Sequence, residues 1–285
     1  MMKMIKKTLI LFTALFSVGW SAFAQDPLRV LSYNILEGMK TDVTPGKQQF
    51  VQWVKDQDPD ILALQEANKF TSETLAALAK SYGHDYSMIV KATGYPVALT
   101  SRFPITDVQK INENITHGFI TATVNGYNIV VLHLNPHKYD VRRQEITTIL
   151  AKIKANNTTK KLIVMGDFNS YSPLDQASHA DGQLVQRFKD AKLKNAAHNN
   201  LVNGEGIDYE VQEKILDFGL IDILKHLADE EPANAKEIIP GKYRIDYIYV
   251  SKDLKKKLVR GKFIRDDFTK KYSDHLPLII ELKQN

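Results

Sequence analysis

A short stretch at residues 161–170, KLIVMGDFNS, places two chemically active side chains directly after an apolar run. Asp167 supplies a carboxylate and Asn169 a carboxamide, and both follow the buried-strand pattern of residues 162–165. The arrangement recurs, because polar groups stand where other apolar runs end or begin. The residues after such runs are Asn34, Glu66 and His133, and those at the start of such runs are Asp246, Asp274 and His275.

Each of these residues has an ordinary explanation when it is taken alone. An Asp or Asn after a strand is a common turn residue. Glu66 can cap the helix that follows it, and His133 can be a satisfied core histidine. The functional prediction therefore depends on the whole set and not on any single member.

The set of side chains indicates a reaction at phosphorus. Carboxylates gathered at one place repel each other unless a cation neutralises them. The chain has no cysteine, so a metal would have oxygen and imidazole ligands, which favours Mg²⁺ or Mn²⁺. Two histidines add groups that contact phosphate or move protons near neutral pH. A hard cation, an activated water and donors to a developing anion are what phosphate-ester hydrolysis requires.

The elements that must position these residues are short strands alternating with amphipathic helices. Asn125-Gly126 predicts a hairpin, so at least one strand pair is antiparallel. In such sheets the end of one strand lies beside the start of its neighbour, which allows all the polar positions to line one rim. The predicted strands are 28–33, 61–65, 97–101, 120–124, 127–134, 162–165, 245–250 and 278–282, and the predicted helices are 47–56, 72–81, 141–155, 184–193 and 209–216.

The alternation of strands and helices predicts an α/β layered sandwich with helices on the outside. We find no linker, internal repeat or low-complexity segment, so residues 25–285 are expected to form a single domain. The polar stretch 171–210 is expected to be an excursion from the core that carries a helix and a long loop.

The first 24 residues match a secretory signal peptide. Lys3, Lys6 and Lys7 precede an apolar run, and small residues lead to a cleavage site near Ala24-Gln25. The run is shorter than the ~20 residues that a transmembrane helix needs, so we expect a secreted or periplasmic protein without a stable membrane anchor. Removal of three lysines lowers the formal charge from +5 to +2, which is a weak signal for nucleic-acid binding.

Seven motifs together resemble the endonuclease/exonuclease/phosphatase (DNase I-like) superfamily. They are SYN at 32–34, LQE at 64–66, LTSRFPI at 99–105, LHL at 132–134, GDFNS at 166–170, RIDYI at 244–248 and SDHLP at 273–277. The resemblance covers roughly the whole mature chain, and GDFN followed by RIDYI and SDHLP is its most specific part. It implies a four-layered α/β/β/α sandwich with two mixed β-sheets and a divalent-metal phosphoesterase site at one mouth.

The resemblance implies roles for individual residues on the metal side of that site. Glu66 corresponds to the principal metal ligand, and Asn34 lies beside it and helps to bind metal or phosphate. Asp274 corresponds to a metal ligand or to a carboxylate that supports the ligands without contacting the metal. Asp167 and Asn169 are expected to orient the attacking water and to hold oxygens of the transition state.

The remaining implied roles concern the phosphate. Asp246 corresponds to the carboxylate that orients His275, and His275 acts as a general base or as a phosphate-stabilising imidazolium. His133 corresponds to the residue that contacts the scissile phosphate or protonates the leaving group. Arg102, within the LTSRFPI motif, is expected to bind substrate together with His133 and Asn169.

The sequence also departs from the family pattern. Leu36 stands where some relatives carry an extra carboxylate, so a second tight metal site is less supported. Tyr95-Pro96 is expected to reshape one wall of the cleft. His137 and Lys138 have no firm family counterpart and are interpreted as a solvated loop.

The function that we predict is hydrolysis of a phosphodiester or phosphomonoester by in-line attack of water, by a monomer that uses Mg²⁺ or Mn²⁺. A secreted endonuclease acting on DNA or RNA is an alternative, and a catalytically silent binding module is a further one. Lipid-cleaving relatives tend to carry an exposed apolar hairpin, for which the stretch 238–240 is a small candidate. The physiological substrate, the number of metal ions and the partner of segment 171–210 stay open.

Overall fold

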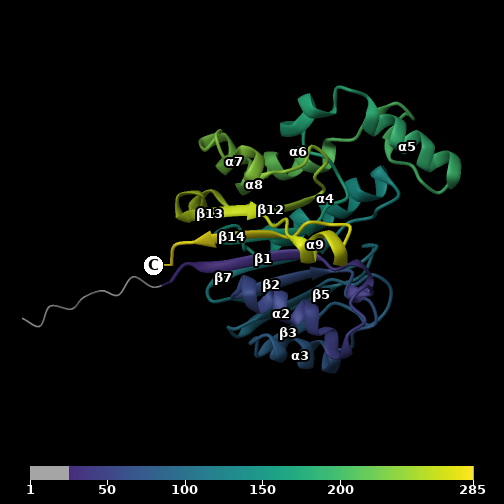
Figure 1. The fold of residues 1–285 in the computed structure, drawn as a ribbon. Coiled ribbons are helices and arrows are strands. Elements are labelled where there is room, and N and C mark those ends of the chain that lie inside the picture. Colours follow the sequence, from purple (N-terminus) through teal and green to yellow (C-terminus); the bar gives the residue numbers. More distant parts are fainter. Residues whose placement is uncertain (1–25, 285) are drawn as a thin grey trace, which may run out of the picture.

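The structure is a computed structural model that describes residues 26–284. Two six-stranded sheets form the centre of the molecule (Figure 1). The predicted signal peptide, residues 1–24, lies outside the described residues. The first sheet has the order β13 (Leu258–Phe263), β14 (Leu278–Leu282), β1 (Leu28–Asn34), β2 (Ile61–Gln65), β4 (Ala98–Ser101), β3 (Tyr86–Ile89). The second has the order β11 (Ile221–Asp222), β12 (Asp246–Val250), β8 (Leu162–Asp167), β7 (Tyr127–His133), β6 (Phe119–Val124), β5 (Ile105–Ile111).

Both sheets are mixed, as predicted. A parallel pair lies inside each sheet, β1 with β2 and β7 with β8, and antiparallel neighbours flank it. The predicted hairpin is present, because Val124 pairs with Tyr127 across Asn125-Gly126. The ends of β1, β2, β7 and β8 therefore lie at the same edges as the starts of their antiparallel neighbours β14 and β12.

Three hydrophobic clusters separate four layers. Side chains alternate along each strand, so Val30 of β1 packs between the two sheets while Leu31 packs on the outer face of the first. The cluster between the sheets takes residues from both, for example Ala63 of β2 and Met165 of β8. The third cluster lies on the outer face of the second sheet and includes Val164. This is the predicted α/β/β/α sandwich.

Helices cover the outer faces of both sheets. α2 (Gln48–Gln57), α3 (Ser72–Ser81) and α9 (Asp267–Tyr272) pack on the first sheet, and α4 (Tyr139–Ala155) and α6 (Glu210–Asp217) pack on the second. α7 (Ile223–Glu230) and α8 (Ala235–Ile238) contact β12 or β13 and add side chains to the cluster between the sheets. The short turn α1 (Leu36–Met39) follows β1. No helix among residues 26–284 combines the length and the apolar character that a membrane crossing requires.

The stretch 171–210 leaves the layered core, as expected. It contains a 3-10 helix (Pro173–His179), the helix α5 (Gln183–Lys194) and the small hairpin β9 (Leu201–Val202) and β10 (Gly206–Ile207). Only Leu184 of α5 is buried, and α5 lies at the upper right of Figure 1, away from both sheets. Arg142 and Arg143 of α4 hold the excursion through Asn200 and Asp208.

Candidate active site

Three neighbouring strands of the second sheet bring His133, Asp167 and Asp246 side by side. In the register of the sheet, Asp167 at the end of β8 pairs with His133 on one side and with Asp246 on the other. The residue before Asp167 must be glycine, because Gly166 has a φ of +143° and an added Cβ would lie 1.9 Å from the carbonyl oxygen of Leu132. This close approach fixes where the Asp167 carboxylate emerges.

Asn34 and Glu66 come to the same place from the first sheet. The Asn34 Nδ2 donates to Asp167 Oδ2 at 3.1 Å and to Glu66 Oε1 at 3.3 Å. Glu66 follows β2 with a left-handed φ of +57°, and its other oxygen accepts from the Glu37 backbone N–H at 2.9 Å. A left-handed glutamate is uncommon and such residues concentrate at functional sites. One amide thus connects carboxylates from both sheets.

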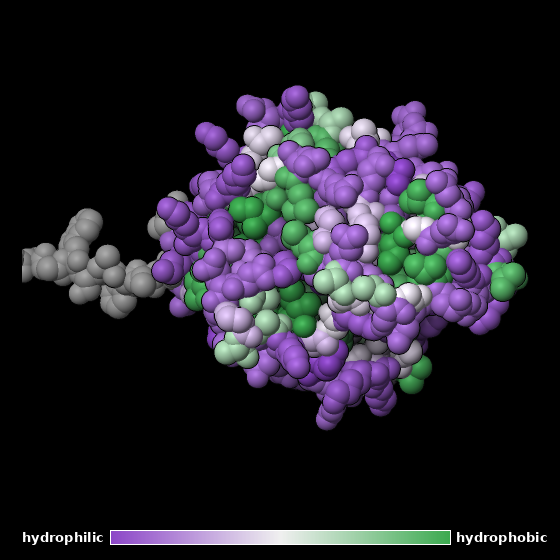
Figure 2. Space-filling model, turned by 90° about the horizontal axis from the view of Figure 1, so that it is seen from above, coloured by the Kyte–Doolittle hydropathy of each residue, from purple (hydrophilic) through white to green (hydrophobic). Residues whose placement is uncertain are grey.

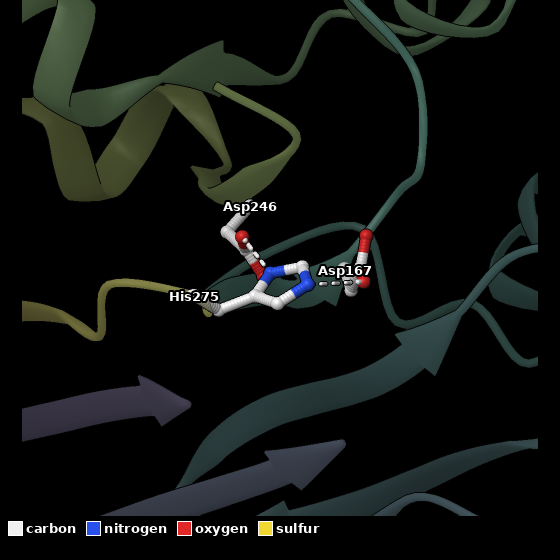
Figure 3. A group of neighbouring side chains, drawn as sticks. All are labelled: Asp167, Asp246 and His275. Atoms are coloured by element: carbon white, nitrogen blue, oxygen red, sulfur yellow. Dashed lines mark hydrogen bonds and ion pairs between the residues drawn. The ribbon is translucent and has the colours of Figure 1, made fainter. Parts of the chain in front are cut away.

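His275 forms a tight pair with Asp246 (Figure 3). The imidazole Nδ1 lies 2.7 Å from Asp246 Oδ2, and the Nε2 lies 3.8 Å from Asp167 Oδ2. Burial opposes the positive charge, but the carboxylates of Asp246 and Asp167 outweigh it and raise the pKa of His275 to about 10. Ser273 holds the loop, since its hydroxyl donates to the Asn34 carbonyl and accepts from the His275 N–H.

Asp167 is the central carboxylate and is 1% exposed. Burial and the neighbouring Asp246 raise its pKa to about 7, although His275, the Asn169 N–H and the Asn34 amide oppose the rise. The Asn169 backbone N–H donates to Asp167 Oδ1 at 2.8 Å. Asn169 takes a left-handed φ of +47° there, and its side-chain amide donates to the Leu134 carbonyl. Hydrogen-bond donors on several sides therefore hold the Asp167 carboxylate in place, and its pKa lies close to neutral pH.

His133 and His117 form a stacked pair beside Asp167. The His133 Nε2 lies 3.5 Å from Asp167 Oδ2, and the two imidazole centroids are 4.2 Å apart with an interplanar angle of 25°. Burial, followed by the nearby His117 and His275, holds the pKa of His133 well below its usual range. Burial and then Lys91 and His137 lower the pKa of His117 to about 4. Both rings are thus neutral at physiological pH.

His117 and Glu145 are site residues that the sequence reasoning missed. His117 is 8% exposed, and its buried Nε2 has no hydrogen-bond partner among residues 26–284. Glu145 of α4 accepts from the Thr116 N–H at 2.7 Å and from the Asn135 N–H at 2.8 Å, which fixes the backbone next to His117. His117 stands just before the predicted strand 120–124, so its place at the start of a strand was an available signal. Glu145 lies inside a helix and offered none.

Two cavities meet at His275. The first has a volume of about 330 Å³ and includes the metal-side residue Glu66. The second, about 310 Å³, lies on the Asp246 side and reaches the excursion. Tyr95 lies on the wall of the first cavity, and His137, interpreted from the sequence as a solvated loop residue, lies on that wall as well. The first cavity is lined by Glu66, Tyr95, Thr116, His117, His133, Asn135, Pro136, His137, Asp167, Asn169 and His275.

The donor set fits a hard divalent cation. Asp167, Asp246 and His275 offer ligand atoms that lie within 4.8 Å of one another. Asp246 is already engaged by His275, however, so Glu66, which Asn34 holds next to Asp167, is the carboxylate better placed to hold an ion. Asn34 presents its nitrogen to both of them while its oxygen accepts from the Leu36 N–H. In this arrangement Asn34 orients the two carboxylates, and its side-chain oxygen does not serve as a further ligand for the ion.

The structure separates two predicted residues from this cluster. Asp274 is exposed and lines the second cavity next to His275; it makes no hydrogen bond within the described range 26–284. Arg102 is a correction: its N–H donates to the Asp60 carbonyl and its guanidinium pairs with Asp58 and Asp60. Asp60 precedes β2 whereas the site lies beyond its end, so Arg102 is at the far edge of the sheet and does not bind substrate here.

Comparisons with known proteins agree with this geometry. A sequence model of the Endonuclease/Exonuclease/phosphatase family matches residues 31–275, and no curated protein matches the sequence. Similar solved structures include an AP endonuclease from Archaeoglobus fulgidus, with 18% identity, a TM-score of 0.62 and coverage of 90% of this chain and 100% of that one. A 3'-5' exonuclease from Neisseria meningitidis has 20% identity, a TM-score of 0.61 and the same coverage. At these identities the similarity shows the fold.

Proposed function

Because the chain belongs to the endonuclease/exonuclease/phosphatase family, we propose that it hydrolyses a phosphate ester with the help of a divalent metal ion. The observation that carries the proposal is the Asn34 amide, which links the carboxylates of Glu66 and Asp167 beside the Asp246–His275 pair. Carboxylates so close together are the expected surroundings of a cation.

Glu66 would hold the ion, and Asn34 would keep its carboxylate in place beside Asp167. When bound, Mg²⁺ or Mn²⁺ supplies positive charge that polarises a phosphoryl oxygen and favours attack at phosphorus. The oxygen donors fit these ions, and the described residues around the site include no sulfur ligand.

His275 stabilises charge on the phosphate. Its pKa of about 10 keeps the ring protonated at neutral pH, so it donates from Nε2 and does not serve as a base. Asp246 fixes the ring through Nδ1, which directs the Nε2–H toward Asp167 and the meeting point of the two cavities. Between the two roles that the sequence left open, the electrostatics support the imidazolium.

Asp167 orients the attacking water and accepts its proton. A carboxylate with a pKa of about 7 is well matched to proton transfer near neutral pH. The Asn169 N–H holds one Asp167 oxygen, which leaves the carboxylate in a fixed orientation. The water is thereby directed at phosphorus from a single side.

His133 contacts the phosphate as a neutral group. Its lowered pKa makes it a poor proton donor at neutral pH, which argues against the role of leaving-group acid. Stacking on His117 fixes the plane of its ring. Asn169 lines the same cavity and supplies an amide to the phosphate oxygens.

An exported endonuclease is the second candidate. The helix α5 carries four basic residues, Arg187, Lys189, Lys192 and Lys194, and Arg187 lines the cavity that contains His275. Such a basic helix at the mouth suits a nucleic-acid backbone. A silent binding module is less supported, because the metal-side Glu66 and the Asp246–His275 pair are all in place.

The test is hydrolysis of bis-p-nitrophenyl phosphate and p-nitrophenyl phosphate with Mg²⁺ or Mn²⁺, and again with EDTA. We expect turnover that EDTA abolishes and that Glu66→Ala reduces on the order of 100-fold or more. A supercoiled-plasmid nicking assay and a sphingomyelin assay run in parallel separate a nuclease from a lipid hydrolase. Absence of turnover on every substrate would contradict the proposal.

A further inference from the structure

The second cavity reaches from the catalytic pair to the excursion and has a volume of about 310 Å³. Asp246 and His275 form one end, and Arg187 of α5 lies on its wall. A group attached to a phosphate at His275 would therefore extend into it, so its contents bear on the substrate of the proposed function. The remaining lining residues are Tyr171, Ile239, Pro240, Gly241, Tyr243, Arg244, Ile245, Phe263, Asp274 and Leu276.

Two tyrosines on the wall are fixed by contacts outside the cavity. Tyr171 is buried, and its ring meets the rings of His179 and Phe188 with centroids 5.4 Å and 5.9 Å away. Tyr243 faces His179 with centroids 6.0 Å apart, and the Lys242 ammonium lies 4.8 Å from its ring centroid. Aromatic faces that are held in advance lose little entropy when a flat ligand stacks on them.

The other walls are apolar. Ile239, Pro240, Phe263 and Leu276 line the cavity, and Ile238 beside them is buried in the cluster between the sheets. The apolar stretch 238–240, a candidate for a lipid-binding hairpin in the sequence, is therefore turned inward. The face of the molecule in Figure 2 is mostly hydrophilic with small separate apolar areas, which gives a lipid surface no broad contact there.

The charges on the wall favour a ligand that accepts hydrogen bonds. The Arg244 guanidinium is neutralised by Asp175 and Asp222. Arg187 makes no ion pair or hydrogen bond within the described part of the chain, and its charge partly opposes the rise that burial causes in the pKa of Tyr171. The carboxylate of Asp274 lies on the wall next to His275. Arg187 is thus the charged donor left for a ligand.

We propose that this cavity binds a single nucleobase of a nucleoside phosphate ester, with the base against the rings of Tyr171 and Tyr243 and Arg187 donating to an acceptor atom on the base. Bases stack on aromatic side chains whatever their sequence, and the carbonyl oxygens of a base suit a guanidinium donor. The inference rests on the proposed function, because it assigns the substrate of the same site.

Two other ligands fit the cavity less well. A quaternary ammonium group also favours aromatic walls, but Arg187 places a second positive charge on the same wall. Ligand cavities usually span about 300–1,000 Å³, so about 310 Å³ suits one base and not a base pair or a long acyl chain. A base in this cavity must therefore be unpaired, as in a mononucleotide or a single strand.

The test compares two esters that release the same p-nitrophenol: the p-nitrophenyl ester of thymidine 5'-monophosphate and methyl p-nitrophenyl phosphate. We expect wild-type kcat/KM to be about tenfold higher for the thymidine ester, as one stacked base allows. Tyr243→Ala and Arg187→Gln should each bring the ratio of the two kcat/KM values toward one. Lys154→Gln, which removes a charge from an exposed position of α4 outside both cavities, should leave the ratio unchanged.

A binding measurement separates this inference from the proposed function. The dissociation constant of thymidine 5'-monophosphate should rise about tenfold in Arg187→Gln and stay constant in Lys154→Gln. If this pattern holds without any ester turnover, the proposed function fails and the base site stands. If the esters are hydrolysed but neither the ratio nor the binding responds to Arg187→Gln and Tyr243→Ala, the base site is overturned. Faster turnover of a choline phosphodiester than of the thymidine ester would overturn it too.

Discussion

The Nδ1 of His275 lies 2.7 Å from the Asp246 carboxylate, and this contact determines the charge of the ring. Burial alone would discharge the imidazole, yet the paired carboxylate and the nearby Asp167 raise the pKa of His275 to about 10. In the mechanism that we propose, the imidazole enters the reaction as a cation whose orientation is already fixed.

Asp246→Asn should lower kcat on the order of 100- to 1000-fold and move the basic limb of the pH–rate profile to lower pH. The active form of His275 is protonated, so activity falls as pH rises through its pKa. Without the Asp246 charge that pKa drops toward its usual range near 6.5. The measurement is kcat from about pH 5 to about pH 11, so that rates are recorded on both sides of each pKa. A basic limb that stays in place in the variant would show that His275 does not act as the cation.

Glu66→Gln should reduce kcat on the order of 100-fold or more and raise the Mg²⁺ concentration needed for half-maximal rate. The loss follows from the removal of a metal-facing charge while the fold is kept. Glu37→Gln is the matched control, because Glu37 contacts Glu66 through its backbone N–H and its own carboxylate pairs with Lys40. Equal effects of the two variants on the Mg²⁺ requirement would remove Glu66 from the metal site.

Glu145→Ala should destabilise the fold by about 2 kcal/mol, since the backbone N–H groups of Thr116 and Asn135 lose their buried acceptor. Glu145→Gln keeps one acceptor oxygen and should cost less. Urea unfolding measures both, and Gln144→Ala on the exposed side of α4 should change the free energy of unfolding by less than about 0.5 kcal/mol. Because Glu145 fixes the backbone beside His117, Glu145→Gln should also lower kcat. Unchanged kcat would limit Glu145 to a structural role.

Acid should destabilise the protein through His84, which lines neither cavity of the candidate active site. Burial lowers the pKa of His84 to about 4, while its nitrogens contact the Thr100 hydroxyl and the Pro59 carbonyl. Between pH 6.5 and 4 the unfolded chain binds the proton and the folded one does not, so the free energy of unfolding falls as pH decreases. The loss is about 3 kcal/mol at most.

His84→Gln should be less stable at neutral pH, where it loses part of these hydrogen bonds, but should show a flatter dependence of unfolding free energy on pH in that window. Urea titrations at several pH values measure the slope. An identical slope in both proteins would show that His84 does not carry the acid sensitivity.

Much of the layered fold followed from alternation in the sequence. Val30 and Leu31 point to opposite faces of β1, and both faces are buried, so the run is largely apolar until it ends at Asn34. In β8, likewise, the apolar run ends at Met165 and Asp167 follows two residues later. β13 was not among the predicted strands, because it is an edge strand in which Arg260 and Lys262 face solvent and it has no continuous apolar run. β5, the edge of the other sheet, is also largely exposed.

Site residues that directly follow apolar strands could be predicted from the sequence. The prediction failed for residues whose position depends on contacts between segments that are far apart in the chain. Arg102 follows β4 just as Glu66 follows β2, yet the two strands are antiparallel and end at opposite edges of the sheet. Glu145 acts through the backbone of Thr116, which no side-chain pattern reveals. His117 matters because its ring stacks on His133, a contact between strands that one sequence does not display.

The position of β14 between β13 and β1 has a consequence for biosynthesis. His275 immediately precedes this strand, and Asn34 near the other end of the chain shares the Ser273 hydroxyl with it. The candidate site of a nascent polypeptide is therefore incomplete until β14 has paired with β1, because that pairing brings Ser273 and His275 beside Asn34.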